Sequence, residues 1–235
     1  MKNRLLFTTA LIAAAFAVSD ARAERLVVSS GEEEAVNAEM SANDNSELQG
    51  GAILNSGKLT VADGVVFNGN AGSVGGAVST VDASGAAVIG DNVSFIGNTS
   101  AMQGGAYHNQ RATSTIGDNA KFHNNTAIGY GGAVYQDTDG REAVLTIGDN
   151  AEFKGNKSET SHGGAVMNFN AGDKAEITIG KNAVFSGNSA GKTGGAVANW
   201  GAACGSAKEP LLPKTVRRPT AAPFITQTTA AKTPK

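Results

Sequence analysis

The chain has 235 residues with a formal net charge of −2, and 31 of them are glycine, which argues against a helical or mixed fold because glycine destabilises helix interiors. The single cysteine, Cys204, excludes an intramolecular disulfide framework, so the fold must be held by backbone pairing and packing. Residues 24–200 contain 19 acidic against 10 basic side chains, and this excess of negative charge argues against nucleic acid as a partner.

The first 23 residues have the pattern of a secretory signal peptide. Lys2 and Arg4 precede a largely apolar run from Leu5 to Val18, and Ala21-Arg22-Ala23 supplies small residues for cleavage. The apolar run is too short to span a bilayer comfortably, and no later window reaches the roughly 18 to 20 apolar residues that a transmembrane helix needs. We therefore expect an exported mature chain without a transmembrane segment.

Residues 24–200 form a repeat domain that is built on two tetrapeptides. Gly-Gly-Ala begins at six positions that lie 25 to 32 residues apart: 50, 75, 104, 131, 163 and 194. Between them lie five Phe-x-x-Asn phrases: Phe67/Asn70, Phe95/Asn98, Phe122/Asn125, Phe153/Asn156 and Phe185/Asn188. A β-branched aliphatic residue always stands six positions before the Phe, and Met40 with Asn43 marks a degenerate first copy. Repeats of this period indicate a solenoid.

Each repeat has the pattern of short strands joined at tight corners. Leu145-Thr146-Ile147 and Ala151-Glu152-Phe153 alternate apolar and polar residues, as half-buried strands do. Gly148-Asp149-Asn150 between them predicts a corner, because glycine and asparagine tolerate positive φ. Gly-Gly-Ala followed by Ile, Val or Tyr predicts a third strand. The repeats therefore predict an all-β fold, a parallel β-solenoid of about six coils spaced ~4.8 Å apart.

Stacked coils would place equivalent side chains above one another in ladders. Phe67, Phe95, Phe122, Phe153 and Phe185 would form an internal aromatic column, with Met40 beneath it. Asn70, Asn98, Asn125, Asn156 and Asn188, with Asn43, would form an amide ladder at a bend. A single coil cannot bury its apolar face, so stability is expected to grow with each neighbour.

One segment resembles a phosphate-binding loop without matching it. Three residues, rather than four, separate Gly187 from Gly191-Lys192-Thr193, and no helix is expected to follow. The segment occupies the same repeat position as 156–164 one coil earlier. We interpret it as a solvated turn, and the sequence predicts no cofactor.

A column of acidic residues is expected at the corners of the coils. Its members are Asp63, Asp91, Asp118 and Asp149, with Lys181 in the next coil. Each carboxylate is expected to cap backbone amides of its turn, and a weak calcium-bridged ladder is the alternative. The calcium-binding nonapeptide motif is absent, so no metal ligands are predicted.

The histidines and tyrosines give weaker signals. His108, His123 and His162 fall at different repeat positions, without the spacing of a metal site or a catalytic triad, and are expected to be exposed. Tyr107, Tyr130 and Tyr135 lie around two neighbouring Gly-Gly-Ala corners, where they form either a small contact patch or ordinary packing.

The only dense group of acidic and basic residues is Asp137, Asp139, Arg141 and Glu142, in an elongated loop. Many extracellular β-solenoids are polysaccharide lyases or hydrolases, whose chemistry needs two or three carboxylates that converge on one face. A carbohydrate-active β-helix enzyme is therefore the alternative function. A solvated loop tip is the preferred interpretation, and no catalytic residues are predicted.

The two tetrapeptides together resemble the polymorphic outer membrane protein repeats of type V autotransporter passengers. The matching phrases are "GGAI" at 50, "GGAV" at 75, 131, 163 and 194, "GGAY" at 104, and "FNGN", "FIGN", "FHNN", "FKGN" and "FSGN". The resemblance covers residues ~36 to 200 and implies a right-handed parallel β-helix. It also implies a non-enzymatic, adhesin-like scaffold that is secreted or displayed on the surface of a Gram-negative bacterium. Its expected partner is a protein or glycan of a host or neighbouring cell.

Residues 201–235 have a different composition and are expected to form a disordered, Pro-rich, basic tail. They contain all five prolines and six basic residues against one acidic residue. Autotransporter passengers are followed by a translocator barrel, and none follows here. We interpret the segment as a frame-shifted or prematurely ended continuation of a longer passenger. A natural tail that lies against peptidoglycan or an acidic wall polymer is the alternative.

Overall fold

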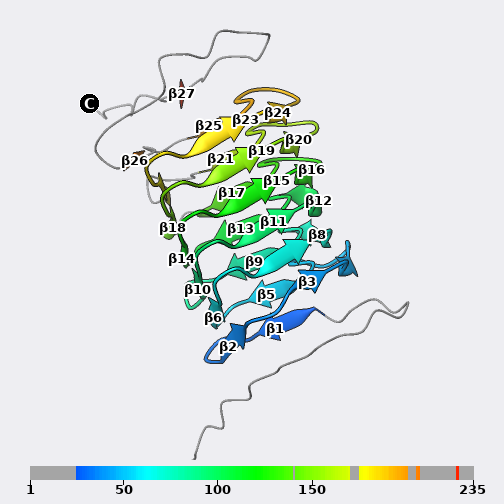
Figure 1. Cartoon of the computed structure of the whole chain (residues 1–235), viewed down its shortest axis with the longest axis vertical. Coiled ribbons are helices and arrows are strands. Elements are labelled where there is room, and N and C mark those ends of the chain that lie inside the picture. The colour runs from blue at the N-terminus through cyan, green and yellow to red at the C-terminus, as the bar shows by residue number, and fades with distance from the viewer. Residues whose placement is uncertain (1–24, 140, 170–174, 201–204, 207–225, 228–235) are drawn as a thin grey trace, which may run out of the picture.

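The computed structural model describes residues 25–139, 141–169, 175–200, 205–206 and 226–227. In these residues every regular element is a β-strand, and no helix is present that could cross a membrane. The strands wind upward into a stack of coils, from β1 at the bottom to β25 near the top (Figure 1). The fold is an all-β parallel β-helix of about six coils, as the repeats predict.

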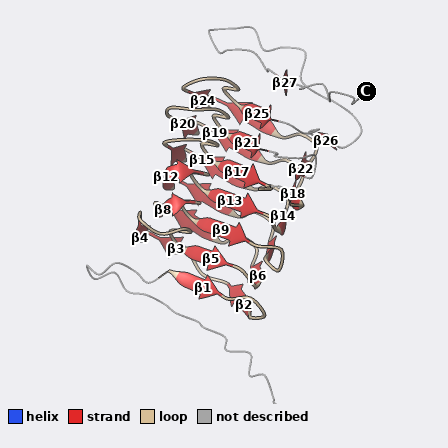
Figure 2. Cartoon of the chain, turned by 180° about the vertical axis from the view of Figure 1, so that it is seen from behind, coloured by secondary structure: helices blue, strands red, loops and turns tan. Residues whose placement is uncertain are grey.

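Four parallel sheets, which we name A to D in the order in which the chain visits them, form the walls of the β-helix (Figure 2). Sheet A contains β1 (Leu26–Val28), β5 (Ile53–Asn55), β9 (Val78–Val81), β13 (Tyr107–Gln110), β17 (Val134–Asp137), β21 (Val166–Phe169), β25 (Val197–Trp200) and β27 (Thr226–Gln227). Sheet B contains β2 (Glu33–Val36), β6 (Lys58–Val61), β10 (Ala86–Ile89), β14 (Thr113–Ile116), β18 (Ala143–Ile147), β22 (Ala175–Ile179) and β26 (Gly205–Ser206).

The other two sheets contain six strands each. Sheet C contains β3 (Met40–Ser41), β7 (Val66–Asn68), β11 (Ser94–Ile96), β15 (Lys121–His123), β19 (Glu152–Lys154) and β23 (Val184–Ser186). Sheet D contains β4 (Asp44–Asn45), β8 (Ala71–Val74), β12 (Thr99–Gln103), β16 (Thr126–Ala127), β20 (Lys157–Ser158) and β24 (Ser189–Ala190).

Each complete coil therefore has four strands, where the sequence pattern predicts three. The additional strand belongs to sheet D and follows the Asn of Phe-x-x-Asn. Several strands of sheet D have only two residues, such as Thr126–Ala127 and Lys157–Ser158. A two-residue strand has no room for the apolar and polar alternation that marks a strand in a sequence.

Glycine is required at both positions of the Gly-Gly pair. Gly104 has a φ of +63°, and a Cβ there would lie 2.5 Å from the carbonyl oxygen of Tyr107. Gly105 packs against the coil above, where a Cβ would lie 2.0 Å from the carbonyl oxygen of Gly132. The first glycine allows the turn into sheet A, and the second allows neighbouring coils to approach each other.

One continuous apolar core fills the inside of the β-helix. Leu145, Ile147 and Phe153 are fully buried in the middle of the stack. At the top, Phe185 and Val197 are only partly buried. The upper end of the described core is thus less covered than its middle.

Two short strands continue the sheets beyond Trp200. The strand β26 pairs in parallel with β22, and β27 pairs in parallel with β25. The rest of the predicted tail, 201–235, lies outside the described residues, as does the predicted signal peptide, 1–23.

Candidate functional site

The phenylalanine column is an internal stack, as the repeat spacing predicts. Neighbouring ring centroids lie 4.6 to 4.9 Å apart, with interplanar angles of 7° or less, from Phe67 through Phe95, Phe122 and Phe153 to Phe185. Four of the five rings have no exposed surface, and only the terminal Phe185 is partly exposed. The column therefore holds coils together and offers no accessible surface to a ligand in the middle of the stack.

The asparagine ladder is also present, and each of its inner members is fully hydrogen-bonded. Asn98 Nδ2 donates to Asn125 Oδ1 at 3.0 Å and to the carbonyl oxygen of Phe67 at 3.0 Å. Asn98 Oδ1 accepts from the main-chain N–H and Nδ2 of Asn70, both at 2.9 Å. An amide side chain has two donor hydrogens and two acceptor sites, so these four bonds use its whole capacity. The ladder is structural and has no group left for a ligand.

A second internal polar column lies behind sheet A and was missed in the sequence. Asn109 Nδ2 donates to Gln136 Oε1 at 2.9 Å, and Asn168 Nδ2 donates to Asn199 Oδ1 at 3.1 Å. Five of its six positions, each five residues after the first Gly of Gly-Gly-Ala, hold Asn or Gln: Asn55, Asn109, Gln136, Asn168 and Asn199, with Thr80 as the exception. The recurrence of Asn or Gln at this position was the signal in the sequence from which the column could have been predicted.

Tyr107 is part of this internal network. Its hydroxyl lies 2.8 Å from Ser114 Oγ and 3.0 Å from Thr80 Oγ1. Burial raises the pKa of Tyr107 to about 12, although both hydroxyl contacts act in the opposite direction. The structure thus separates Tyr107 from Tyr130 and Tyr135, which lie on the outer side of sheet A.

The aspartate column caps the corners between sheets B and C. The Oδ1 atom of each Asp accepts the main-chain N–H of the equivalent residue one coil above, at distances of 2.7 to 2.9 Å: Asp63 from Asp91, Asp91 from Asp118, Asp118 from Asp149, and Asp149 from Lys181. The prediction that each carboxylate caps amides of its own turn is therefore wrong in its partner, because the N–H that it accepts belongs to the coil above. No group of three or more His, Cys, Asp or Glu in the described residues could hold a metal ion.

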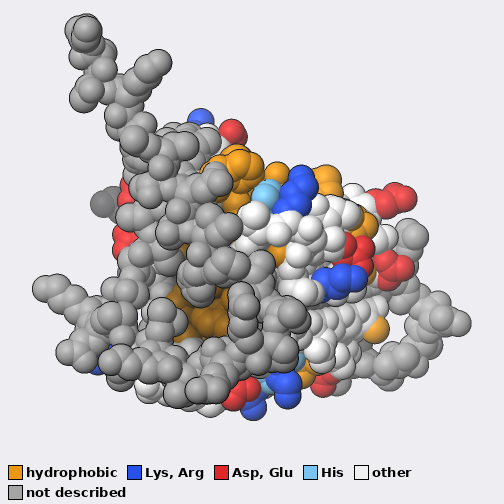
Figure 3. Space-filling view, turned by 90° about the horizontal axis from the view of Figure 1, so that it is seen from above, with side chains coloured by type: hydrophobic (Ala, Val, Ile, Leu, Met, Phe, Trp, Pro, Cys, Tyr) orange, Lys and Arg blue, Asp and Glu red, His pale blue; other side chains and the backbone are white. Residues whose placement is uncertain are grey.

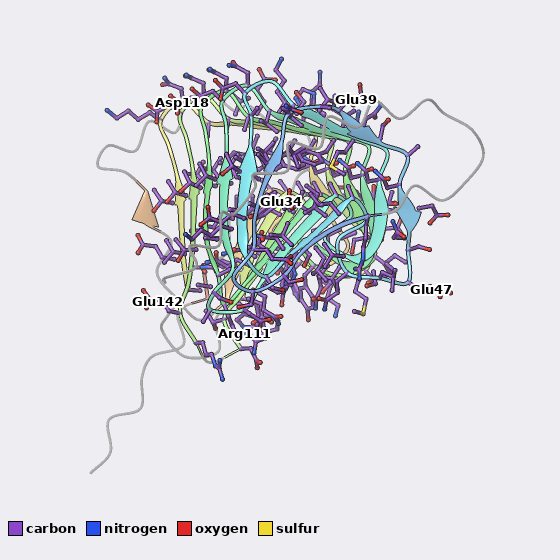
Figure 4. All side chains as sticks on the ribbon, turned by 90° about the horizontal axis from the view of Figure 1, so that it is seen from below. Glu34, Glu39, Glu47, Arg111, Asp118 and Glu142 are labelled. Atoms are coloured by element: carbon purple, nitrogen blue, oxygen red, sulfur yellow. The ribbon has the colours of Figure 1, made fainter. Side chains whose placement is uncertain are left out.

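The acidic and basic loop of the alternative enzyme hypothesis lies at another corner, between sheets A and B. Looking up the stack, Arg111 and Glu142 lie across the β-helix from Asp118 (Figure 4). Arg111 Nη2 lies 2.9 Å from Asp82 Oδ1, and Arg111 Nη1 lies 3.7 Å from Asp139 Oδ2. Asp137 Oδ1 accepts the main-chain N–H of Asp139 at 2.9 Å. These contacts engage Asp139 and Asp137 in an ion pair and in a turn.

The expectation that all three histidines are exposed is wrong for His108. Its side chain is buried, and its Nδ1 lies 2.9 Å from Ser79 Oγ. Burial lowers the pKa of His108 to about 3, so the ring is neutral at pH 7. Its Nε2 has no hydrogen-bond partner among the described residues. His123 is partly exposed and lies 3.1 Å from Glu152 Oε2.

Aromatic side chains gather on the outer side of sheet A in the upper coils. We call this set the aromatic face: Tyr130, Tyr135, His162, Phe169 and Trp200. Tyr130 stacks on Tyr135 at 5.9 Å between ring centroids, and Tyr135 stacks on His108 at 5.6 Å. Tyr130 also stacks on His162 at 5.8 Å. The contact patch considered for Tyr130 and Tyr135 is thus part of a larger cluster.

The aromatic face is held in place from beneath, and Trp200 is its most exposed member. Tyr135 packs with Met167 and Ala198 in a small buried cluster, against which Tyr130 and Phe169 pack. Trp200 is 40% exposed. Seen from above, hydrophobic side chains, a histidine and basic side chains lie together on one side of the stack (Figure 3).

Comparison with protein-family models, curated proteins and solved structures gives no match for this chain. The resemblance to autotransporter passenger repeats therefore depends on the two tetrapeptides alone.

Proposed function

We propose that this protein is a non-enzymatic, exported β-helix scaffold that acts as an adhesin-like surface or secreted protein of a Gram-negative bacterium. The supporting observation is that the coils share one interior and differ on the outside. The Phe and Asn ladders repeat through the stack, whereas the outer positions of sheet A change in every coil. A rigid stack with variable outer positions suits a protein that presents contacts.

The interior supplies the rigidity that such a display requires. Each inner coil contributes one stacked ring and one saturated amide, both in direct register with the coils above and below. Cooperative contacts of this kind hold the strands in one arrangement. The outer side chains are therefore presented at fixed spacing along the stack.

The contacts of the acidic and basic loop support the enzyme alternative less well than the ladders support the scaffold. Glycoside hydrolysis requires two carboxyl groups that face each other across a scissile bond. Asp139 instead lies beside the guanidinium of Arg111, and Asp137 accepts a main-chain hydrogen bond within the turn of its own loop. We therefore prefer the scaffold function.

Adhesion of protein-coated beads tests the proposal. The full chain would be coupled to beads and applied to cultured epithelial cells, Gram-negative bacterial cells and immobilised polysaccharides, with albumin-coated beads as the control. We expect saturable adhesion to at least one of these surfaces, inhibited by soluble protein. Adhesion no greater than that of albumin beads on every surface would overturn the proposal.

A reducing-sugar assay on the same polysaccharides separates the two functions. We expect no increase in reducing ends over a control without protein. A sustained increase that is lost in Asp137→Asn or Asp139→Asn would favour the enzyme instead.

A further inference from the structure

The aromatic face is not required to build the coils. Its members occupy three positions of the repeat: the residue before Gly-Gly-Ala, and the fourth and sixth residues after its first Gly. In lower coils these positions hold no aromatic side chain. In the two lowest Gly-Gly-Ala coils they hold Gln49, Leu54, Ser56, Val74, Ser79 and Val81. Those coils have the same parallel pairing and register as the upper ones. Coils of this kind therefore form without aromatic side chains at these positions.

The rings form a continuous surface that follows the axis of the stack. The His162 centroid lies 5.8 Å from that of Tyr130 and 5.2 Å from that of Trp200. Phe169 meets Trp200 edge to face at 5.7 Å, because the two residues are paired on adjacent strands. Rings that touch and pack on a buried floor are fixed before any ligand arrives, which lowers the entropic cost of binding.

Hydrogen-bond donors and a hydrogen-bond acceptor border these rings. Thr193 Oγ1 is hydrogen-bonded to His162 Nδ1, and the exposed Lys192 precedes it in the same loop. Burial, followed by the Lys192 ammonium, lowers the pKa of His162 below its ordinary value. Asp137 is paired with Phe169 on the neighbouring strand. Donors and a carboxylate acceptor thus flank an apolar surface.

The size of the face selects the class of ligand. A stable protein interface buries about 800 Å² on each partner and involves about 20 to 30 residues a side. The aromatic face has five residues, and Tyr135 among them is buried. A pyranose ring has a flat C–H surface bordered by hydroxyl groups, which matches a few rings bordered by an ammonium, a hydroxyl and a carboxylate.

We propose that the aromatic face binds a saccharide, with a pyranose ring stacked on Trp200 and its hydroxyls hydrogen-bonded by side chains at the rim such as Lys192. This inference builds on the adhesin-like function and names the partner as a glycan. The Trp200 indole is the accessible platform, because Trp200 is the most exposed of the five residues. Tyr130 and Phe169 position it through His162 and through direct contact.

Intrinsic fluorescence tests binding directly, because Trp200 is the only tryptophan of the chain. The full chain would be titrated at millimolar concentrations with methyl glycosides of glucose, galactose, mannose, N-acetylglucosamine, N-acetylgalactosamine, glucuronic acid and sialic acid. We expect a saturable change in emission with at least one of them. No saturable change with any member of this panel would overturn the proposal.

Residues from lower coils provide variants that are compatible with the fold. Trp200→Gln introduces the residue that Gln110 provides at the same position, and Tyr130→Gln does the same with Gln103. Val88→Ser is the matched control, since Val88 is 57% exposed on the outer side of sheet B. Circular dichroism would establish that each variant retains its strands.

Calorimetry with the saccharide that gives the fluorescence change compares these variants. We expect Trp200→Gln to weaken affinity at least about tenfold, as loss of an aromatic anchor does, and Tyr130→Gln to weaken it less. Val88→Ser should bind like the wild type. Unchanged affinity in a folded Trp200→Gln variant would overturn the site.

Bead adhesion separates this inference from the function on which it depends. Loss of adhesion in Trp200→Gln, together with inhibition by the free saccharide, supports both. Adhesion that persists in Trp200→Gln overturns the saccharide site and leaves the adhesin-like function standing. A third outcome would overturn the glycan in favour of a protein partner. In that outcome Trp200→Gln loses adhesion, protease treatment of the target cells abolishes adhesion of the wild type, and no saccharide binds.

Discussion

The interior of the β-helix and the outer side of sheet A follow opposite rules although they belong to the same coils. Inside, Phe122 has a ring of the same kind above and below it, and Asn125 has an amide above and below it. Outside, Tyr135 lies between His108 below and Met167 above. An internal residue must match two copies of itself, whereas Tyr135 packs against a different kind of residue on each side, although all three are buried. Repetition of one residue type therefore indicates an internal ladder.

The largest effect is expected when the aromatic column is interrupted. The ring of Phe122 is fully buried between Phe95 and Phe153, with centroid distances of 4.9 and 4.8 Å. Phe122→Ala removes both stacking contacts and leaves a cavity, so we expect it to lower the free energy of unfolding by about 4 kcal/mol. Urea denaturation followed by circular dichroism measures this change.

Phe185→Ala is the matched control for this substitution. Phe185 is partly exposed and stacks only on Phe153, at 4.6 Å. We expect a cost of about half that of Phe122→Ala, because one of two neighbours and part of the burial are missing. Equal costs would contradict the idea that stability comes from contacts with both adjacent coils.

The next effect concerns the buried amide ladder. Asn125 Nδ2 donates to Asn156 Oδ1 and to the carbonyl oxygen of Phe95, and its Oδ1 accepts two bonds from Asn98. Asn125→Ala leaves buried donors and an acceptor without partners, at about 1 to 3 kcal/mol for each unsatisfied group. We expect a total loss of about 3 kcal/mol in urea denaturation.

An exposed amide ladder at the corner provides the comparison. Asn119 Nδ2 donates to Asn92 Oδ1 at 3.2 Å, and Asn119 has a φ of +58°. Asn119→Gly preserves this backbone conformation and removes this exposed bond and the exposed bond that Asn119 Oδ1 accepts from Asn150 Nδ2, so we expect less than about 0.5 kcal/mol. A loss as large as that of Asn125→Ala would show that burial is not what makes the inner ladder important.

The parts of the fold that were predicted from the sequence are those where identical residues recur at fixed spacing. Phe and Asn keep their mutual distance in every repeat, so the parallel coils and both ladders followed from it. Sheet D was missed, because a strand such as Thr126–Ala127 is too short to show alternation. The Asn109 column was missed, because it mixes Asn, Gln and Thr.

The aromatic face could be predicted only in part, because its members come from different repeats. Tyr130 and Tyr135 are close in sequence and were considered together. His162, Phe169 and Trp200 join them only through the register of sheet A. His108 was expected to be exposed because it falls at a different repeat position from the other histidines, without the spacing of a metal site or a triad, yet Tyr135 stacks over it. Alternation indicates exposure only where the outer side of a sheet is bare.

His108 should make the outer side of sheet A sensitive to acid. Its pKa is lowered to about 3 by burial, whereas the unfolded chain has the ordinary value of 6.5. Below pH 6.5 the unfolded state therefore takes up a proton that the folded state does not, and stability falls by about 1.4 kcal/mol per pH unit until about pH 3. We expect a loss of about 2 kcal/mol between pH 7 and pH 5.

His108→Ser isolates this contribution from that of the carboxylates. Serine is the residue that Ser79 provides at the same position one coil below. The difference in unfolding free energy between wild type and variant, measured by urea denaturation at pH 7 and pH 5, should decrease by about 2 kcal/mol at the lower pH. A difference independent of pH would mean that the pKa of His108 is not lowered in the folded state.

A smaller effect than that of the internal ladders is expected at the aspartate corners, which recur from coil to coil as those ladders do but are largely exposed. Asp118 Oδ1 accepts the N–H of Asp149 at 2.7 Å, and Asp118 is exposed. Asp118→Ala removes the acceptor, and we expect it to lower the free energy of unfolding by about 1 kcal/mol. Urea denaturation at low and high salt measures the change.

Asp118→Asn distinguishes the acceptor from the charge. Asparagine retains the oxygen that caps the next coil and removes one charge from a column of like charges, whose repulsion is about 1 kcal/mol or less per pair in water. We expect this variant to be as stable as the wild type at high salt and slightly more stable at low salt. If it is as damaging as Asp118→Ala, the carboxylate charge rather than its hydrogen bond holds the corner. The stability of the corners would then depend on surface charge and not on the hydrogen bond that each aspartate accepts from the next coil.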